Sequence, residues 1–351
     1  MARIGIIGTG WGARVQAPAL RRAGLEVVAI AGRDPAKTAA IAAELDLEPY
    51  ASGEELIARA EVDLISIVSP PKTHRPYAIR ALERGRHVLC EKPTALNARE
   101  AEQMLSAAER RPDRLALIDH ELRFLPSWLE AKRRIGELGP IRWAEVRYSS
   151  PSRNDPNRPW NWWSDLAQGG GVWGAVGSHY VDALRYFAGE IDAVQAVLHT
   201  FIRRRPLPEG GVREVTADDF AAVHLRLASG GLSPMTFTAV SAVDEDSGLT
   251  IVGEKGAFRL VQDRLLHAQV RGEWSELVAG AGSEFTGDSP GGAFGTATIR
   301  LGEALRNFLD EGDREALAPA ATFLDGLRQQ QVLDAARASH RNGGAWEPAA
   351  R

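Results

Sequence analysis

A glycine-rich turn near the N-terminus is the first segment whose residues suggest a specific chemistry. The turn Gly8-Thr9-Gly10-Trp11-Gly12-Ala13 directly follows the apolar run Ile4–Ile7 and leads into a helical pattern. In this G-x-G-x-x-(G/A) spacing, the first glycine makes the tight turn, the second admits a pyrophosphate, and the last small residue lets helix and strand pack closely. The helix that follows offers unpaired N–H groups to phosphate oxygens. We therefore expect Gly8, Gly10, Trp11, Gly12 and Ala13 to bind a dinucleotide.

The end of the second predicted strand bears on which dinucleotide binds. An acidic residue that binds the ribose is expected about 20 residues beyond the turn, but the strand 27–31 ends in Gly32-Arg33-Asp34. Arg33 could pair with a 2′-phosphate or stack on adenine. Asp34 could instead cap the next helix, with Pro35 in its first turn. The sequence therefore favours NADP as cofactor, with NAD as the alternative.

Lys92 lies just after the fourth predicted strand, 88–90, in the turn Glu91-Lys92-Pro93. Ligands of open α/β sheets bind beyond the carboxyl ends of the strands, and Pro93 stiffens this turn. Only five of the 42 basic residues are lysines, so a lysine at a strand end is notable in this chain. The simplest alternative is a solvated surface lysine.

Several motifs together resemble the Gfo/Idh/MocA oxidoreductase family. They are Gly8-Thr9-Gly10, Pro70-Pro71 followed by His74, Glu91-Lys92-Pro93, and Gly169-Gly170-Gly171 followed by Gly177-Ser178-His179-Tyr180-Val181-Asp182. Their order and spacing cover residues 1 to about 260. The segment 120–126 is similar to the branch of glucose-fructose oxidoreductase domain-containing proteins.

The resemblance implies a nicotinamide cofactor and a sugar, polyol or related cyclic substrate. It implies that Lys92 binds the reacting oxygen and that His179 is general base in oxidation and general acid in reduction. These roles suit the side chains, because an imidazole exchanges protons near neutrality and an ammonium stabilises an alkoxide. The remaining expected contacts are Arg33, Pro70, His74, Glu91 and Lys92 for the cofactor, and Arg123, Trp160, Trp162, Trp163, Asp165 and Asp182 for the substrate.

One position departs from the family pattern. The family usually has an aspartate four residues before the histidine, where this chain has Ala175. Asp165 or Asp182 could supply the missing carboxylate. Alternatively, the protein could cleave a glycoside through transient oxidation with cofactor recycling, or bind the cofactor without turnover. The leading prediction is an NAD(P)-dependent oxidoreductase acting on a hydroxyl or keto group.

Three tryptophans lie in a long polar connection over residues 150–168. The faces of Trp160, Trp162 and Trp163 could stack on the C–H face of a sugar, and their N–H groups could donate hydrogen bonds. The same rings could instead attach the loop to its own domain or fill a subunit interface.

The elements that must position these residues fall into two patterns. Residues 1–122 alternate short apolar runs with amphipathic stretches, which predicts a parallel sheet with helices on both faces. Period-two alternation at 222–227 and 235–240 predicts a large, mainly antiparallel sheet. We therefore expect an α/β fold, with a Rossmann dinucleotide-binding domain over 1–122 and an α+β substrate-binding and oligomerisation domain over 123–351. Its C-terminal helices are expected at about 294–340.

Composition excludes several classes of protein. A net charge of −4 gives no reason to expect binding to nucleic acid or an anionic membrane. The single cysteine, Cys90, excludes an internal disulfide and a multi-cysteine metal site, and no metal is expected. No leader precedes the first strand, so a cytoplasmic protein is expected. The open sheet needs covering, and the family resemblance implies a homodimer or homotetramer.

Overall fold

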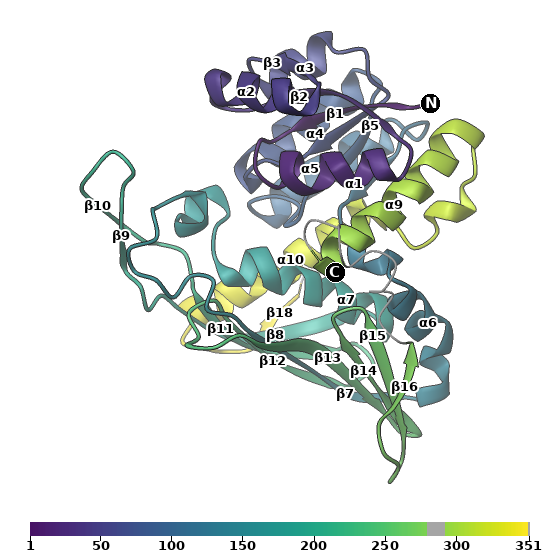
Figure 1. The fold of residues 1–351 in the computed structure, drawn as a ribbon. Coiled ribbons are helices and arrows are strands. Elements are labelled where there is room, and N and C mark those ends of the chain that lie inside the picture. The colour runs from purple at the N-terminus through teal and green to yellow at the C-terminus, as the bar shows by residue number, and fades with distance from the viewer. Residues whose placement is uncertain (279–291, 350–351) are drawn as a thin grey trace. The chain divides into compact units, whose positions relative to one another are not determined.

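The computed structural model describes residues 1–278 and 292–349, which form two compact units (Figure 1). The first unit comprises residues 1–95 and 99–125 together with the described residues 292–327. The second comprises residues 96–98, 126–278 and 328–349. The sequence predicts one domain boundary, at 122–123, whereas the later residues 292–327 also belong to the first unit.

The first unit is built on a seven-stranded sheet with the order β17-β6-β5-β4-β1-β2-β3. All neighbours are parallel except β17 and β6. The chain runs outward from β1 to β3 and then resumes at β4 on the other side of β1, so the order reverses between β1 and β4. The strands are β1 (Arg3–Ile7), β2 (Glu26–Ala31), β3 (Glu48–Tyr50), β4 (Leu64–Ile67), β5 (His87–Cys90), β6 (Ala116–Ile118) and β17 (Ala321–Thr322).

Two apolar cores lie against this sheet, because successive side chains of its strands alternate between them. Ile4 and Ile6 of β1 belong to one core, and Ile7 belongs to the other with Ile65 and Ile67 of β4. Burial on both faces explains why these strands are almost uniformly apolar. The helices are α1 (Ala17–Arg22), α2 (Pro35–Leu45), α3 (Gly53–Arg59), α4 (His74–Glu83), α5 (Ala98–Glu109) and α9 (Gly292–Glu311).

Helix α9 belongs to the first unit because its apolar side packs there. Leu301 and Leu305 join the same core as Ile4 and Ile6. A Cβ on Gly302 would lie only 2.7 Å from the Cβ of Ala23. Because this residue is a glycine, α9 can approach the end of α1 closely. The periodicity of residues 294–310 predicts the helix but carries no information about which core receives it.

The second unit contains a nine-stranded sheet with the order β16-β15-β14-β13-β7-β12-β11-β8-β18. Only β7 and β12 are parallel neighbours, so the predicted α/β fold with a mainly antiparallel second sheet is confirmed. The strands are β7 (Ile141–Ser149), β8 (Ile191–His199), β11 (Phe220–Leu227), β12 (Leu232–Thr238), β13 (Glu245–Gly253), β14 (Gly256–Val261), β15 (Arg264–Gln269), β16 (Ser275–Val278) and β18 (Glu347–Pro348); β9 (Arg204–Pro206) and β10 (Val212–Glu214) form a separate hairpin.

One face of this sheet carries the helices α6 (Pro126–Arg134), α7 (Ser178–Ala188) and α10 (Phe323–Arg341) (Figure 1). Strand β11 shows the expected alternation, with Val223 and Leu225 buried and His224 exposed. Trp143 and Leu232 are direct cross-strand partners on the opposite face, and both are exposed.

No helix within residues 1–278 and 292–349 is both long and apolar enough to cross a membrane.

Candidate cofactor and active site

The glycine-rich turn is closely packed at two glycines and open at the third. Gly8 has φ +146°, donates its N–H to the Ala31 carbonyl (2.8 Å), and has no room for a Cβ, which would lie 2.2 Å from the Val68 carbonyl oxygen. A Cβ on Gly12 would lie 2.8 Å from the Ile6 side chain. A Cβ on Gly10, in contrast, would meet no described atom within 4 Å. The backbone is therefore accessible at the residue where a pyrophosphate is expected to approach.

Two other residues of the turn, Trp11 and Ala13, are held by the first unit. The ring of Trp11 meets Phe294 of α9 edge-on, with 6.4 Å between centroids. Ala13 is buried in the core with Ile4 and Ile6. The turn continues into a short π-helix over Gly12–Gln16 before α1 begins.

The end of β2 excludes the usual acidic residue on steric grounds. A Cβ on Gly32 would lie 2.6 Å from both the Thr38 hydroxyl oxygen and a methyl carbon of Thr9. Asp34 caps α2 instead, since its carboxylate accepts a hydrogen bond from the Lys37 N–H at 3.1 Å. Arg33 is exposed and forms no hydrogen bond or ion pair with the described residues. Its guanidinium is thus available to a nucleotide.

His74 supports the turn that carries Lys92. It is fully buried, with Nδ1 at 3.0 Å from the Pro93 carbonyl oxygen and Nε2 at 2.7 Å from that of Ser69. Burial lowers the pKa of His74, and a neutral ring, which has one N–H, donates to only one of these two carbonyls at a time. Pro70 begins the short turn between β4 and α4, and its carbonyl accepts from the Thr73 N–H (2.9 Å). His74 therefore links the loop after β4 to Pro93, whose peptide bond with Lys92 is cis.

A buried group of polar side chains adjoins Glu91 and Lys92. The side-chain amide nitrogen of Gln16 donates to the carboxyl groups of Asp119 (2.5 Å) and Glu91 (3.2 Å). The Gln16 amide oxygen accepts from the Ser66 hydroxyl (2.6 Å), which fixes the orientation of the amide. Asp119 and Glu121 are only 1% and 3% exposed.

The charges of this group influence one another strongly. Burial raises the pKa of Asp119 and of Glu121 well above the usual range, and the negative charges of their neighbours raise both further. Burial also raises the pKa of Glu91, whereas Lys92 opposes that shift. Two carboxyl groups that share one amide donor in a buried site do not both ionise readily. Burial and the neighbouring carboxylates therefore both oppose the loss of the last proton from this group.

Gln16, Asp119 and Glu121 are not among the site residues that the sequence predicts. A usable signal existed, because Asp119 directly follows the apolar strand β6, and a carboxylate there lies at the edge of the sheet where ligands bind. Gln16 is a buried polar residue in an otherwise small and apolar segment.

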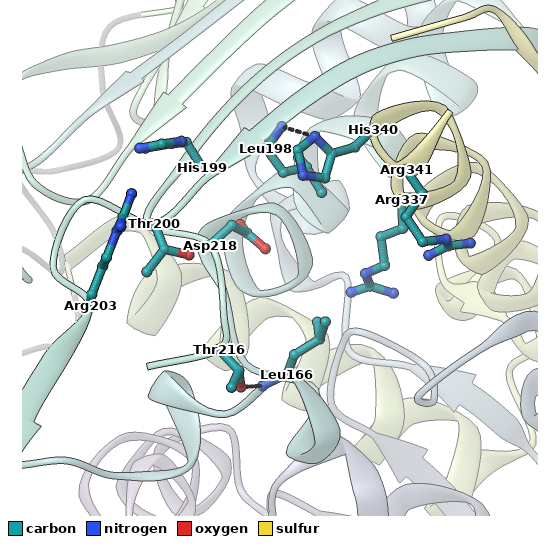
Figure 2. Close-up of a pocket in the computed structure, with 10 residues that line it drawn as sticks. All are labelled: Leu166, Leu198, His199, Thr200, Arg203, Thr216, Asp218, Arg337, His340 and Arg341. Atoms are coloured by element: carbon teal, nitrogen blue, oxygen red, sulfur yellow. Dashed lines mark hydrogen bonds between the residues drawn. The ribbon is translucent and has the colours of Figure 1, made fainter. Parts of the chain in front are cut away.

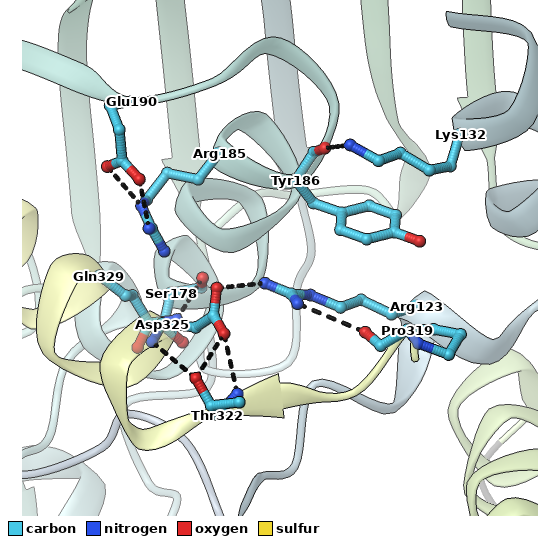
Figure 3. A network of polar contacts seen from close by, with 10 residues as sticks. All are labelled: Arg123, Lys132, Ser178, Arg185, Tyr186, Glu190, Pro319, Thr322, Asp325 and Gln329. Atoms are coloured by element: carbon cyan, nitrogen blue, oxygen red, sulfur yellow. Dashed lines mark hydrogen bonds and ion pairs between the residues drawn. The ribbon is translucent and has the colours of Figure 1, made fainter. Parts of the chain in front are cut away.

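Arg123 holds the first unit together rather than standing open to a ligand. It is buried, and its guanidinium bonds Asp325 (3.3 Å) and the Pro319 carbonyl oxygen (3.3 Å) (Figure 3). Asp325 also accepts from the N–H and hydroxyl of Thr322, each at 2.8 Å. Arg123 therefore fixes the segment that leads from β17 into α10.

In the second unit, His179 and Asp182 lie one turn apart in α7, and both are buried. The side-chain amide of Gln329 in α10 donates to the Ser178 carbonyl at 2.7 Å, which fixes the start of α7 (Figure 3). A Cβ on Gly177 would lie 2.3 Å from the Trp173 ring, so this glycine allows the ring to pack beneath the helix start. The Gly177–Asp182 motif thus places His179 on a rigid element.

Two further aspartates of the second unit already have structural tasks. Asp218 is buried, and its carboxylate accepts from the Trp173 N–H at 2.7 Å. Asp165 accepts from the Ala167 N–H (3.0 Å) and from the Gln168 amide (2.9 Å), so it caps its own turn. Of the two carboxylates predicted to replace the acid missing at Ala175, Asp182 shares a helix with His179 and Asp165 does not.

The three tryptophans of the segment 150–168 differ in their contacts. The Trp160 indole donates to the Glu214 carbonyl (3.0 Å), and Arg213 stacks over its ring at 4.0 Å, so Trp160 attaches the loop to the β9–β10 hairpin. Arg153 lies 4.3 Å above the half-buried Trp163 ring, which meets Trp162 edge-on. Burial lowers the pKa of Arg153 to about 10, with the charges of Arg158 and Arg205 adding to the shift.

The open glycine turn, the reversal of strand order and the polar strand ends define a dinucleotide-binding protein with a Rossmann fold. A family described as "Oxidoreductase family, NAD-binding Rossmann fold" matches residues 2–118, and one described as "GFO/IDH/MocA C-terminal domain" matches residues 128–259. The chain belongs to the Gfo/Idh/MocA oxidoreductase family, which confirms the predicted resemblance.

Relatives match over nearly the whole chain. Glucose-fructose oxidoreductase domain-containing protein 2 of Bos taurus is 32% identical, covering 98% of this chain and 92% of its own. An uncharacterized oxidoreductase of Synechocystis is 31% identical over 96% and 94%. Among solved structures, levoglucosan dehydrogenase in complex with NADH and L-sorbose has a TM-score of 0.87, with 23% identity over 100% and 99% of the two chains. That structure is similar in fold.

Proposed function

We propose that this protein is an NAD(P)-dependent dehydrogenase or reductase acting on a CH–OH or keto group of a sugar, polyol or related cyclic compound. The observation that carries the proposal is the open backbone at Gly10 in the same unit as Lys92, both at carboxyl ends of parallel strands. The NAD-binding description of the matched family supports it. Levoglucosan dehydrogenase, whose structures hold NADH with L-sorbose or levoglucosan, supports the substrate class.

The residues that would hold the cofactor fit its chemistry. Gly8 and Gly12 pack the turn closely against the first unit, Gly10 leaves space where a pyrophosphate would approach the backbone, and Arg33 offers a cation to the adenosine end. A bound nicotinamide would accept or supply the hydride. Arg33 and the blocked position at Gly32 support NADP, whereas the family description supports NAD. We retain NADP as the proposal, with NAD as the alternative that a direct titration decides.

In the proposed reaction, Lys92 binds the reacting oxygen and stabilises the negative charge that develops on it. His179 removes the hydroxyl proton in oxidation and returns one to the oxygen in reduction. Asp182, on the same side of α7, orients the imidazole in place of the acid absent at Ala175. Trp162 and Trp163 contribute flat faces for the substrate.

The carboxyl group pair at Glu91 and Asp119 would control the charge near Lys92. If the pair shares one proton, it presents a single negative charge rather than two. One negative charge attracts the Lys92 ammonium to the Glu91-Lys92-Pro93 turn, whereas two would outweigh its single positive charge. This places Glu91 as a positioning residue, consistent with the hydrogen bond that its side chain accepts from the Lys92 backbone N–H (3.2 Å).

The test combines cofactor binding with turnover. Nicotinamide fluorescence is titrated with purified protein, and a panel of sugars and polyols is then screened for NAD(P)H formation. Replacement of His179 by asparagine is expected to lower turnover by about 10²–10⁴-fold with little change in cofactor affinity. Failure to bind either dinucleotide would overturn the proposal. Glycoside cleavage with no net NAD(P)H formation would replace it with the cofactor-recycling alternative.

The exposed sheet face supports a homo-oligomer. Trp143, Val197 and Leu232 are large exposed apolar residues on the outer side of the nine-stranded sheet. We propose that a second copy covers them. Light scattering of wild type and of Trp143→Glu tests this, because a dimer through this face should dissociate in the variant.

A further inference from the structure

A cavity in the second unit carries more positive charge than the rest of the chain would suggest. It has a volume of about 400 Å³ and lies where β8 ends beside the last turns of α10 (Figure 2). Arg337 and Arg341 line it from α10, and Arg203 lines it from the opposite wall. The chain as a whole has a net charge of −4, so three guanidinium groups around one cavity need an explanation.

Two of the three guanidinium groups are available to a ligand. Arg203 and Arg341 are exposed and form no side-chain hydrogen bond or ion pair with any residue of 1–278 or 292–349. Arg337 pairs with Asp334 at 3.3 Å. Because residues 337 and 341 are four apart on one helix, their side chains lie on the same face and can approach one ligand together.

A single carboxylate of the lining opposes these charges. Asp218 belongs to the lining but already accepts from the Trp173 N–H (2.7 Å). Three arginines against Asp218 leave a charge of +2, and +1 if Asp334, which lines the smaller adjoining cavity, is included. The lining is therefore cationic even when its two histidines are left out of the count.

The other lining groups suit hydroxyls rather than a bare ion. The Thr216 hydroxyl oxygen accepts from the Leu166 N–H (3.0 Å), which leaves its proton free to donate. The Thr200 hydroxyl donates to the Ala217 carbonyl (2.9 Å), which leaves its lone pairs free to accept. Leu166 and Leu198 add an apolar surface. This mixture is typical of a small-molecule site, and the volume falls within the usual range.

Stabilisation of the helix end explains only part of the arrangement. Basic residues in the last turn of α10 interact favourably with the helix dipole, which accounts for His340 and Arg341. It does not account for Arg203, which belongs to another segment, or for the cavity between them.

We propose that this cavity binds a small hydroxylated oxyanion, either a sugar phosphate or a sugar carboxylate. Arg337 and Arg341 would bind the oxyanion, since guanidinium groups match phosphate and carboxylate geometry. Arg203 would bind from the opposite wall, and Asp218 and the threonines would meet the hydroxyls. The site requires neither Lys92 nor a nicotinamide, so it goes beyond the proposed reaction.

Calorimetric titration of the full chain without cofactor tests this proposal. Glucose 6-phosphate and glucuronate represent the two oxyanion sources, and glucose is the uncharged comparison. At least one of the two anions should bind saturably, and glucose should bind at least tenfold more weakly, by the usual contribution of a charged hydrogen bond. Arg203→Gln and Arg341→Gln should each weaken binding of the anion by about tenfold.

Arg259→Gln is the matched control, because Arg259 is an exposed arginine of the same unit that does not line the cavity. It should leave binding unchanged. The variants replace exposed side chains, and their melting temperatures verify that each remains folded. Absence of saturable binding by both anions would overturn the proposal, as would equal weakening by all three substitutions. Since no cofactor is used, these results are independent of whether the protein proves to be an oxidoreductase.

Discussion

The side-chain amide of Gln16 donates a hydrogen bond to the carboxyl group of Asp119, with 2.5 Å between nitrogen and oxygen. The two residues are 103 positions apart, one just after the glycine-rich turn and the other just after β6. Glu91 accepts from the same amide, so the nucleotide turn and the Lys92 turn are connected through one buried side chain. The proposed cofactor and catalytic residues of the first unit therefore rest on a shared polar support.

Replacing Asp119 with asparagine is expected to make folding less sensitive to pH. Burial raises the pKa of Asp119, so the folded chain keeps a proton that the unfolded chain releases as pH rises above the normal carboxyl range. This contribution to stability is present at low pH and is lost as pH rises toward the raised pKa of the folded state. Asp119→Asn should therefore gain about 1 kcal/mol relative to wild type at neutral pH, measured by urea unfolding.

Comparing the stability of the variant with that of wild type at each pH removes the opposing contribution of two histidines, the buried His74 and the half-buried His87. Burial lowers the pKa of His74 and of His87, so their contribution to stability grows as pH rises to about 6.5. Asp113→Asn is the control, because Arg111 lowers the pKa of that exposed carboxylate and no gain is expected. Parallel pH profiles for wild type and Asp119→Asn would show that the site does not hold the proton.

Gly8 and Gly10 are expected to respond differently to alanine. A Cβ at position 8 would collide with the Val68 carbonyl, so Gly8→Ala should lower the free energy of unfolding by about 1–3 kcal/mol. A Cβ at position 10 meets open space, so Gly10→Ala should keep its stability but bind the dinucleotide more weakly. Thermal unfolding and fluorescence titration separate the two effects. Equal dinucleotide affinity for Gly10→Ala and wild type would remove the pyrophosphate from this site.

Arg33 is expected to govern the choice of cofactor. Arg33→Ala should weaken NADP binding by about tenfold, since a charged hydrogen bond to the 2′-phosphate is lost, and should change NAD binding much less. Arg84→Ala provides the comparison, because Arg84 is likewise exposed in the first unit. If wild type binds NAD more tightly than NADP and Arg33→Ala leaves the ratio unchanged, the protein is NAD-specific.

Trp160 is expected to matter for the loop and not for the substrate. Trp160→Phe removes the hydrogen bond to the Glu214 carbonyl, which should make the β9–β10 hairpin easier to cleave by protease while KM stays the same. Trp162→Ala should instead raise KM for a saccharide substrate. A rise in KM for Trp160→Phe with no change in proteolysis would reverse these assignments.

The sequence predicted best those features whose causes are local. The spacing of Gly8, Gly10 and Gly12 predicted the turn, and Pro35 after Asp34 indicated the helix cap that the structure contains. The buried polar group was not predictable in this way, because Gln16, Glu91 and Asp119 meet only after the sheet has formed. The short strand β3 was missed for a related reason, since Glu48-Pro49-Tyr50 has neither length nor apolar pattern.

Two of the predicted site residues form hydrogen bonds with segments that are distant in the sequence. Arg123 was a reasonable candidate for binding substrate, yet its charge is used by Asp325, 202 positions away. His74 was a candidate for the cofactor, and its ring is used by the Ser69 and Pro93 carbonyls. In both cases the residue type indicated a polar task, and only the tertiary structure revealed which one.

The central claim is that Lys92 supports hydride transfer to or from a nicotinamide. The most direct measurement is the rate of NAD(P)H formation with the best substrate of the polyol and sugar panel, for wild type, Lys92→Ala and Lys72→Ala. Lys72 is an exposed lysine in the loop after β4 and serves as the matched control. We expect Lys92→Ala to lose about 10²–10³-fold in kcat with cofactor binding retained, and Lys72→Ala to match wild type. Full turnover by Lys92→Ala would contradict the central claim.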